Sequence, residues 1–115
     1  PLDHKYDALY SLDVMEHIPK EDESTFLKNV SLSICTYGVV IIGMPSIESQ
    51  QYASIESKQG HVNCKTGIEL RNILKVFFEN VFMFSMNDEV VHTGFFPMSH
   101  YIIGVCCSPK SREGS

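Results

Sequence analysis

The run of residues 6–19 constrains the fold more than any other part of the chain, because a nearly continuous apolar stretch ends there in a group of polar side chains. Apolar residues fall on both faces of residues 6–12, which is typical of a strand that helices cover on each side. We therefore expect a central, parallel strand. In open sheets with helices, ligands bind at the carboxyl ends of strands, so Asp13, Glu16 and His17 are candidates for a functional site.

The next stretch, residues 20–37, changes to the period of an amphipathic helix, and acids in its first turn suit the positive end of the helix dipole. Residues 39–44 then form an apolar, largely β-branched run. Pro45 stops this run, since proline has no N–H for a strand ladder. The pattern predicts a helix that ends at Tyr37 and Gly38, followed by a second strand. The apolar stripe of the helix consists of Phe26, Leu27, Val30 and Ile34.

A polar, aperiodic segment over residues 46–63 is too long for a simple crossover, so we expect an excursion over the strand ends. Such excursions often cover binding sites. Thr66 and Glu69 then form the sequence signature of a capping box, in which each residue satisfies a backbone N–H of the other. This signature predicts a helix over residues 67–78.

Two further apolar or alternating runs, residues 81–86 and 100–107, predict the final strands. The chain has 115 residues, which allows one domain. We therefore expect residues 1–107 to form a single unit, and the small, polar residues 108–115 to form a flexible tail.

Charge and cysteine usage exclude several classes of protein. The net charge is −5 and no run of Lys or Arg is present, which argues against a nucleic-acid partner. The four cysteines lack the regular spacing of a disulfide framework, so reduced thiols are expected. No apolar stretch approaches the ~20 residues that cross a bilayer. These features predict a cytoplasmic protein that binds neither nucleic acid nor membrane.

The order of these elements resembles a known family. Asp7, the strand around it and the sequence Leu-Asp-Val-Met-Glu-His-Ile-Pro at residues 12–19 resemble the fourth strand and following turn of class I S-adenosylmethionine-dependent methyltransferases. A helix, a strand that ends at Met44 and Pro45, an excursion, a capped helix and two strands follow in that family's order. The resemblance extends over residues 6–107 and is nearest to the branch that methylates small molecules.

The resemblance implies a fold and a cofactor. The fold is α/β and Rossmann-like, with a mostly parallel sheet, a final antiparallel strand and helices on both faces. The chain lacks the family's glycine-rich turn after a first strand and the acidic residue that ends the second strand. We therefore expect the carboxyl-terminal half of a methyltransferase domain, without the half that holds the adenosine of S-adenosylmethionine. The first strand would then be an unpaired apolar edge, which predicts a homo-oligomer through Tyr6–Leu12.

The resemblance also implies site residues at the strand ends. The expected cofactor-binding residues are Ser11, Leu12, Asp13 and His17. Ser11, Leu12 and Asp13 would lie beside the methionine part of the cofactor. Met44 and Pro45 end the second strand, where the family binds its acceptor. The alternative is a purely structural role, in which the Asp13 side chain caps the next short helix and Glu16 and His17 only satisfy backbone groups.

The end of the excursion offers further candidates. His61 and Asn63 are expected to face the acceptor, and His61 is the candidate general base, because an imidazole can take a proton near neutral pH. The alternative is a loop histidine bonded to a neighbouring carbonyl group. His61, His92 and Asp88 could serve a metal-dependent hydrolase. No pair of these residues has the spacing of a strong zinc motif, so the sequence predicts no metal.

Two functions from different classes follow. The first is methyl transfer from S-adenosylmethionine to a small-molecule acceptor, with this fragment inactive by itself. Methyl transfer from a sulfonium is a direct displacement, so positioning matters more than a conspicuous set of catalytic side chains. The alternative is a non-catalytic fold or assembly module that forms a homodimer.

Overall fold

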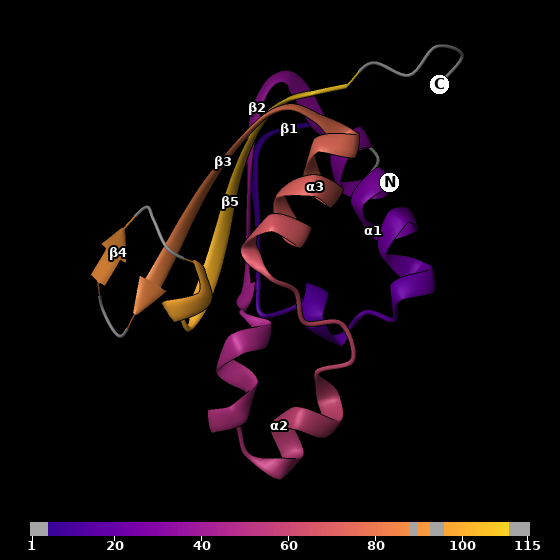
Figure 1. The fold of residues 1–115 in the computed structure, drawn as a ribbon. Helices are drawn as coiled ribbons and strands as arrows, with labels where there is room; N and C mark the ends of the chain where they lie inside the picture. Colours follow the sequence, from indigo (N-terminus) through magenta and orange to yellow (C-terminus); the bar gives the residue numbers. More distant parts are fainter. Residues whose placement is uncertain (1–4, 88–89, 93–95, 111–115) are drawn as a thin grey trace.

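A computed structural model describes residues 5–87, 90–92 and 96–110 of the chain. These residues form a curled, five-stranded sheet in the order β1-β2-β5-β3-β4, with helices packed against it (Figure 1). The predicted mixed α/β class is confirmed. The strands are β1 (Tyr6–Leu12), β2 (Ile34–Pro45), β3 (Phe78–Asn87), β4 (Val90–His92) and β5 (Tyr101–Pro109).

Strand direction corrects the prediction of a mostly parallel sheet. Among the described strands only β1 and β2 pair in parallel, while the strand pairs β2–β5, β5–β3 and β3–β4 are antiparallel. Parallel neighbours need a crossover connection, which α1 (Lys20–Leu32) supplies between β1 and β2. A second crossover, α3 (Gly67–Phe77), leads from β2 to β3, but β5 inserts between these two strands in the opposite direction. The inserted strand makes both of its pairs antiparallel.

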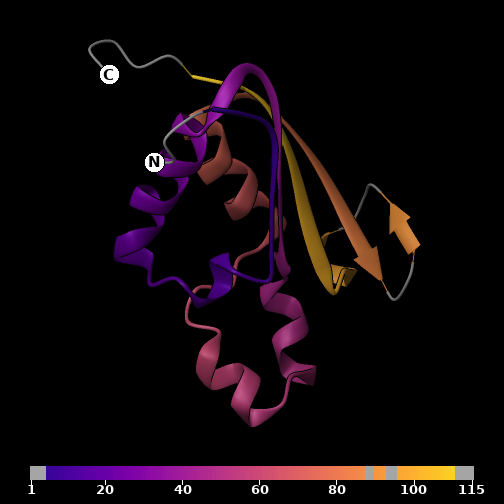
Figure 2. The same cartoon turned by 180° about the vertical axis from the view of Figure 1, so that it is seen from behind.

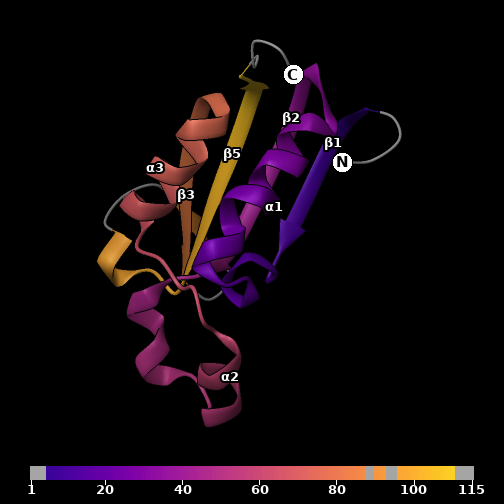
Figure 3. The ribbon, with the colours of Figure 1, turned by 90° about the vertical axis from the view of Figure 1, so that its right-hand side faces the viewer.

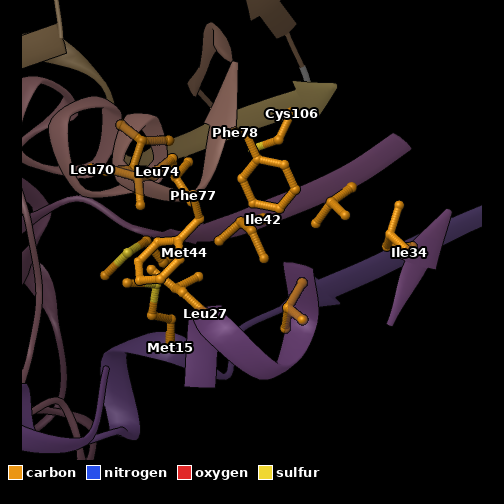
Figure 4. Packing of buried hydrophobic residues seen from close by; sticks show 13 residues of the cluster. Met15, Leu27, Ile34, Ile42, Met44, Leu70, Leu74, Phe77, Phe78 and Cys106 are labelled. Atoms are coloured by element: carbon orange, nitrogen blue, oxygen red, sulfur yellow. The ribbon is translucent and has the colours of Figure 1, made fainter. Parts of the chain in front are cut away.

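Both long helices, α1 and α3, lie on one face of the sheet, as Figures 2 and 3 show. The prediction of helices on both faces is therefore wrong for the described residues. The apolar stripes of the helices pack against alternate residues of β2 and β5 and build one core (Figure 4). The core comprises Met15, Leu27, Val30, Ile34, Val40, Ile42, Met44, Leu70, Leu74, Phe77, Phe78, Ile102 and Cys106.

The boundary between α1 and β2 lies earlier than predicted. The helix ends at Leu32, and Ile34 already pairs with Tyr6 of β1. Residues 34–37 therefore belong to the strand, as their β-branched and aromatic side chains favour. The strand register shifts before the next pair, and a Cβ at Gly38 would clash with the Ile34 side chain there. Gly38 thus permits a bend inside the strand and does not end the helix.

The start of α3 confirms its predicted cap. Thr66 Oγ1 accepts a hydrogen bond from the Glu69 N–H at 3.1 Å, and the Glu69 carboxylate accepts one from the Thr66 N–H at 2.9 Å. The helix ends at Phe77, because Phe78 has an extended backbone and begins β3. The predicted final strands lie within β3 and β5, which pair in antiparallel.

The residues after β2 form the predicted excursion beyond the strand ends (Figure 1). The segment returns to the sheet through an isolated parallel bridge between Ser46 and Lys65. No helix in the described part of the chain is long and apolar enough to cross a membrane. The short helices are η1 (Met15–His17), η2 (Ile47–Tyr52), α2 (Ile55–Gly60) and η3 (Phe96–Met98).

The second face of the sheet is apolar, and neither α1 nor α3 covers it (Figures 1 and 2). One row of register partners crosses it, from Tyr10 through Ile41 and Val105 to Phe82. The Tyr10 side chain is 75% exposed and that of Phe82 55%. Among the described strands β1 pairs only with β2 and lies at the sheet edge, so the central position predicted from its apolar pattern is wrong for the described residues.

Candidate functional site at the ends of the parallel strands

The turn after β1 carries the first half of the candidate site. Asp13 has a φ of 59°, a left-handed conformation that non-glycine residues rarely adopt. Its N–H donates to the Gly43 carbonyl at 3.1 Å, which ties the turn to β2. Two residues later, Met15 is fully buried in the core. The fixed backbone and the anchored methionine together set the positions of Glu16 and His17.

The side chain of Asp13 does not cap a helix. Val14 precedes η1 and Pro19 precedes α1, and neither helix has a side-chain cap, so the alternative structural role of Asp13 is wrong. Asp13 instead interacts with Tyr101, and burial, followed by the negative charge of Asp13, raises the pKa of the Tyr101 hydroxyl. A Cβ at Gly43 would lie 2.8 Å from the Tyr101 oxygen. Only glycine permits this approach of the ring.

Beyond this turn, Glu16, His17 and His61 meet. One potential ligand atom from each of the three side chains lies within 4.8 Å of the other two. Glu16 Oε2 is 3.6 Å from His17 Nε2, and the rings of His17 and His61 meet edge to face with centroids 4.9 Å apart. Glu16 and His17 belong to η1, whereas His61 follows α2. The fold therefore brings together candidates from two separate segments.

Hydrogen bonds define which ring nitrogen of each histidine is free. His17 Nδ1 lies 2.7 Å from the Gly60 carbonyl oxygen, and His61 Nδ1 lies 3.0 Å from Gln50 Oε1. Carbonyl oxygens only accept, so both Nδ1 atoms carry the proton. In the neutral rings, both Nε2 atoms then present a lone pair. The bond from His61 to the side-chain carbonyl of Gln50 is also what the alternative role predicts, a loop histidine bonded to a neighbouring carbonyl group.

Glu16 is the buried charge of the site. Glu16 is only 1% exposed, and its Oε1 atom has no hydrogen-bond partner among the described residues. Burial raises the pKa of the Glu16 carboxyl above its usual value of 4.5, against the lowering effects of a backbone hydrogen bond and of the two histidines. Burial of a carboxylate oxygen without a hydrogen-bond partner costs free energy. This cost makes Oε1 a candidate to bind a cation or a hydrogen-bond donor.

The remaining predicted residues lie on different faces of the sheet. Met44 is fully buried in the helical core, and Pro45 is half-buried beside its register partner Tyr101. Ser11 is half-buried, whereas Leu12 is exposed on the face without helices. Their roles in binding cofactor or acceptor stay predictions.

Asn63 is buried and contacts α1 through Glu23. Its side-chain amide donates to Glu23 Oε2 at 2.7 Å, and its backbone N–H donates to the Glu16 carbonyl at 3.0 Å. Its predicted contact with an acceptor stays a prediction, to which the structure adds a clear packing role.

Sequence reasoning missed the contributions of Gln50, Gly60 and Tyr101. Each acts through a partner distant in sequence, so no local motif marks it. The residues considered for a metal-dependent hydrolase, His61, His92 and Asp88, lie partly outside the described structure. Asp88 is not among the described residues, and His92 is described only as backbone within β4.

The fold is that of S-adenosylmethionine-dependent methyltransferase domains. The crystal structure of the small RNA methyltransferase HEN1 is similar over 91% of this chain and 14% of the HEN1 chain, with a TM-score of 0.69 and 16% sequence identity. The structure of a DhpI–SAH complex is similar over 96% of this chain and 50% of the DhpI chain, with a TM-score of 0.64 and 14% sequence identity. No protein-family model and no curated protein matches the sequence.

These likenesses concern the fold, because the sequence identities are low. The chain spans half of the DhpI chain and a smaller part of HEN1. The described elements match a portion of each of these two proteins, and the likeness is one of fold alone.

Proposed function

We propose that the chain is the carboxyl-terminal part of an S-adenosylmethionine-dependent methyltransferase domain that methylates a small-molecule acceptor. The observation that carries this proposal is the position of Glu16, His17 and His61 at the carboxyl ends of the parallel strands β1 and β2. In α/β sheets this edge binds ligands. The likeness to methyltransferase structures, one of them a SAH complex, supports the same interpretation.

The described residues fit only the methionine end of such a cofactor. Leu12 and Val14 are exposed on either side of Asp13 along the chain, and a carboxylate there can accept hydrogen bonds from an amino group. When bound, S-adenosylmethionine supplies an electrophilic methyl group. The adenosine end would need residues from outside this chain, since the sequence has no glycine-rich turn after a strand.

An acceptor hydroxyl or amine must lose a proton on methylation, and His61 can take it. Its Nε2 atom has the free lone pair, because Nδ1 is bonded to Gln50. The acceptor oxygen or nitrogen gains the methyl group while its proton moves to the imidazole, which then releases it to water. This step is the general-base role predicted for His61.

The geometry also favours a divalent cation as the group that acidifies the acceptor. A carboxylate with two imidazoles is a common ligand set for divalent first-row transition ions. Both histidines are held through their other ring nitrogen, as metal-binding histidines usually are. A cation would also neutralise the buried Glu16 charge. We therefore propose a cation site at Glu16, His17 and His61 as the alternative to a base at His61, because an Nε2 atom that binds a cation cannot also accept a proton. This site differs from the metal-free site predicted from spacing.

The small-molecule acceptor is the preferred class, because the net charge of −5 disfavours a phosphate backbone. HEN1 is a small RNA methyltransferase, so a small RNA is the second candidate acceptor. A filter-binding titration with a short RNA discriminates the two. Saturable binding at physiological salt would favour RNA, and its absence would favour the small molecule.

The cofactor assignment is tested by a nuclear magnetic resonance titration of the chain with S-adenosylhomocysteine. We expect weak binding, with shifts confined to the amides around Asp13 and Gly43. The variant Asp13→Asn should reduce these shifts, while Asp22→Asn on the exposed side of α1 should not. An absence of shifts at this edge up to millimolar ligand would contradict the proposal.

The cation is tested separately with Co²⁺, whose visible absorption reports imidazole and carboxylate ligands. We expect one equivalent of Co²⁺ to bind and the band to disappear in His61→Ala. A spectrum that is unchanged by Co²⁺ would remove the cation and leave His61 as the base. The matched control is His100→Ala, which lies outside the cluster.

The alternative function is an assembly module, and the face without helices favours it. Tyr10, Leu12 and Phe82 are exposed on this face, and β1 is the edge strand of the described sheet. Exposed strand edges of this kind pair with other chains. We propose that two copies associate through Tyr6–Leu12. Sedimentation should show a dimer at micromolar concentration, and Tyr10→Lys should give a monomer; a monomeric wild type would contradict this association.

A further inference from the structure

A second buried polar cluster, Glu23, Asn63 and Lys65, lies next to the candidate site along the chain. Lys65 Nζ is 2.9 Å from Glu23 Oε2, and the two side chains are only 8% and 14% exposed. The Asn63 side-chain amide donates to the same Glu23 oxygen at 2.7 Å. Lys65 Nζ in turn donates to Asn63 Oδ1 at 3.3 Å. The three side chains therefore form a closed triad that joins α1 to the segment after His61.

Stability alone does not explain this triad. Burying two charges costs several kcal/mol of solvation, and apolar side chains of similar size often fold as well or better. The neighbouring core is apolar, so it could accept such a replacement. A fully hydrogen-bonded buried ion pair also fixes one arrangement of the segments that it joins, which apolar contacts would define less sharply.

The geometry that the triad fixes is the path of residues 60–65. The Asn63 N–H donates to the Glu16 carbonyl at 3.0 Å, and the Lys65 carbonyl accepts from the Ile47 N–H at 2.9 Å. On the other side of His61, the Gly60 carbonyl accepts from His17. The segment is thus attached to η1 on both sides of His61, and the triad attaches its far end to α1.

We infer that Glu23, Asn63 and Lys65 are positioning residues that hold His61 against Glu16 and His17. The inference rests on the proposed cation site, because His61 is the only ligand of that site that comes from outside η1. Loss of the triad should release the segment that carries His61 and leave Glu16 and His17 in place. Changes to groups that orient metal ligands commonly weaken metal binding about 10–100-fold.

The test compares Co²⁺ affinity in Lys65→Met with that of the wild type, read from visible absorption. We expect a loss of about tenfold or more, together with a weaker band, because one imidazole is no longer held. Lys75→Met, an exposed lysine in the last turn of α3, is the matched control and should bind like the wild type. Equal Co²⁺ affinity in Lys65→Met and wild type would overturn the inference.

The double variant Glu23→Gln/Lys65→Met removes both charges and guards against a failure of the single variant to fold. It should have the circular dichroism of the wild type and still bind Co²⁺ weakly. Wild-type affinity in this folded double variant would overturn the inference equally.

A second readout does not depend on metal. Nuclear Overhauser contacts between the rings of His17 and His61 should be present in the metal-free wild type and lost in the folded double variant. If the wild type does not bind Co²⁺, the cation site fails, while loss of these contacts still supports the positioning role. Retained contacts would overturn it.

Discussion

The His17 Nδ1 atom lies 2.7 Å from the Gly60 carbonyl oxygen, and this hydrogen bond joins residues that are 43 positions apart. It orients the imidazole so that Nε2 is turned toward Glu16. The end of α2 therefore determines how η1 presents its histidine, and small changes at Gly60 should reach the candidate site.

Gly60→Ala should weaken Co²⁺ binding more than it affects folding. A Cβ at this position would lie 3.3 Å from two atoms of the His17 ring, so the ring must move by a few tenths of an ångström. We expect about a tenfold loss of affinity, the size typical of changes in groups that orient metal ligands. The exposed neighbour Gln59→Ala is the control, and equal affinity in both variants would contradict this role of Gly60.

Glu16→Gln should stabilise the metal-free chain at neutral and higher pH. Burial raises the pKa of Glu16, so below its unfolded value of 4.5 the carboxyl is protonated in both states and costs nothing. As pH rises through the higher folded-state pKa, folding must bury a charge, and wild-type stability falls relative to the variant. The melting temperature of Glu16→Gln in a chelator should therefore exceed that of the wild type at about pH 8 and approach it near pH 4.

The control for this prediction is Glu56→Gln, an exposed acid in the first turn of α2. It should show no such pH-dependent gain. Added Co²⁺ should reverse the order of Glu16→Gln and wild type, because only the wild type gains binding energy from the ion. A variant that is less stable at every pH would contradict the cost of the buried, unpartnered Oε1 atom of Glu16.

Gly43→Ala should destabilise the sheet by about 1–3 kcal/mol, the usual cost of overpacking. The new Cβ would lie 2.7 Å from Tyr101 Cε2 and 2.8 Å from Leu12 Cδ2. Urea denaturation measures the change. In a Tyr101→Ala background the cost should be smaller, because one of the two obstructions is gone, and an unchanged cost would place the strain elsewhere.

Thiol reactivity should separate the four free cysteines. Burial raises the pKa of Cys106 to about 12, and burial together with the charge of Glu16 raises that of Cys64 to about 11. Because the thiolate is the reactive form, both should alkylate slowly near neutral pH. Mass spectrometry after timed iodoacetamide treatment should find label first on Cys35 and Cys107, which are both partly exposed. Early label on Cys106 would show that the core opens readily.

The sequence predicted the elements whose signals are local. Thr66 and Glu69 are three residues apart, so their reciprocal bonds could be read directly. Ile34 was assigned to a helix because it continues an apolar stripe at helical spacing, yet its pairing with Tyr6 outweighs that spacing. The direction of β5 depends on its insertion between β2 and β3, which no pattern within β5 records.

The candidate site was predicted in part for the same reason. Glu16 and His17 follow a recognisable strand end. Because ligands bind at the carboxyl ends of strands in open α/β sheets, both residues are predicted at a ligand-binding edge. His61 reaches them only through the path of the excursion, and its bond to Gln50 fixes the lone pair that faces the site. Metal spacing rules address neighbouring ligands, so they do not detect the proposed cation site, whose residues are divided between two segments.

The capping box gives the last prediction, in which stability and pH are linked. Thr66→Ala should cost about 1 kcal/mol, the usual value for loss of an N-cap side chain. The backbone hydrogen bond from Thr66 lowers the pKa of Glu69, so the contribution of this carboxylate is present above its unfolded value of 4.5 and is lost as pH falls through the lower folded-state pKa. Glu69→Gln should thus weaken the chain at neutral pH and make little difference in strong acid. Asn72→Ala, exposed on the same helix, should not destabilise, because alanine favours helix. A Glu69→Gln effect that persists unchanged into strong acid would mean that packing, and not the charged hydrogen bond, secures the start of α3.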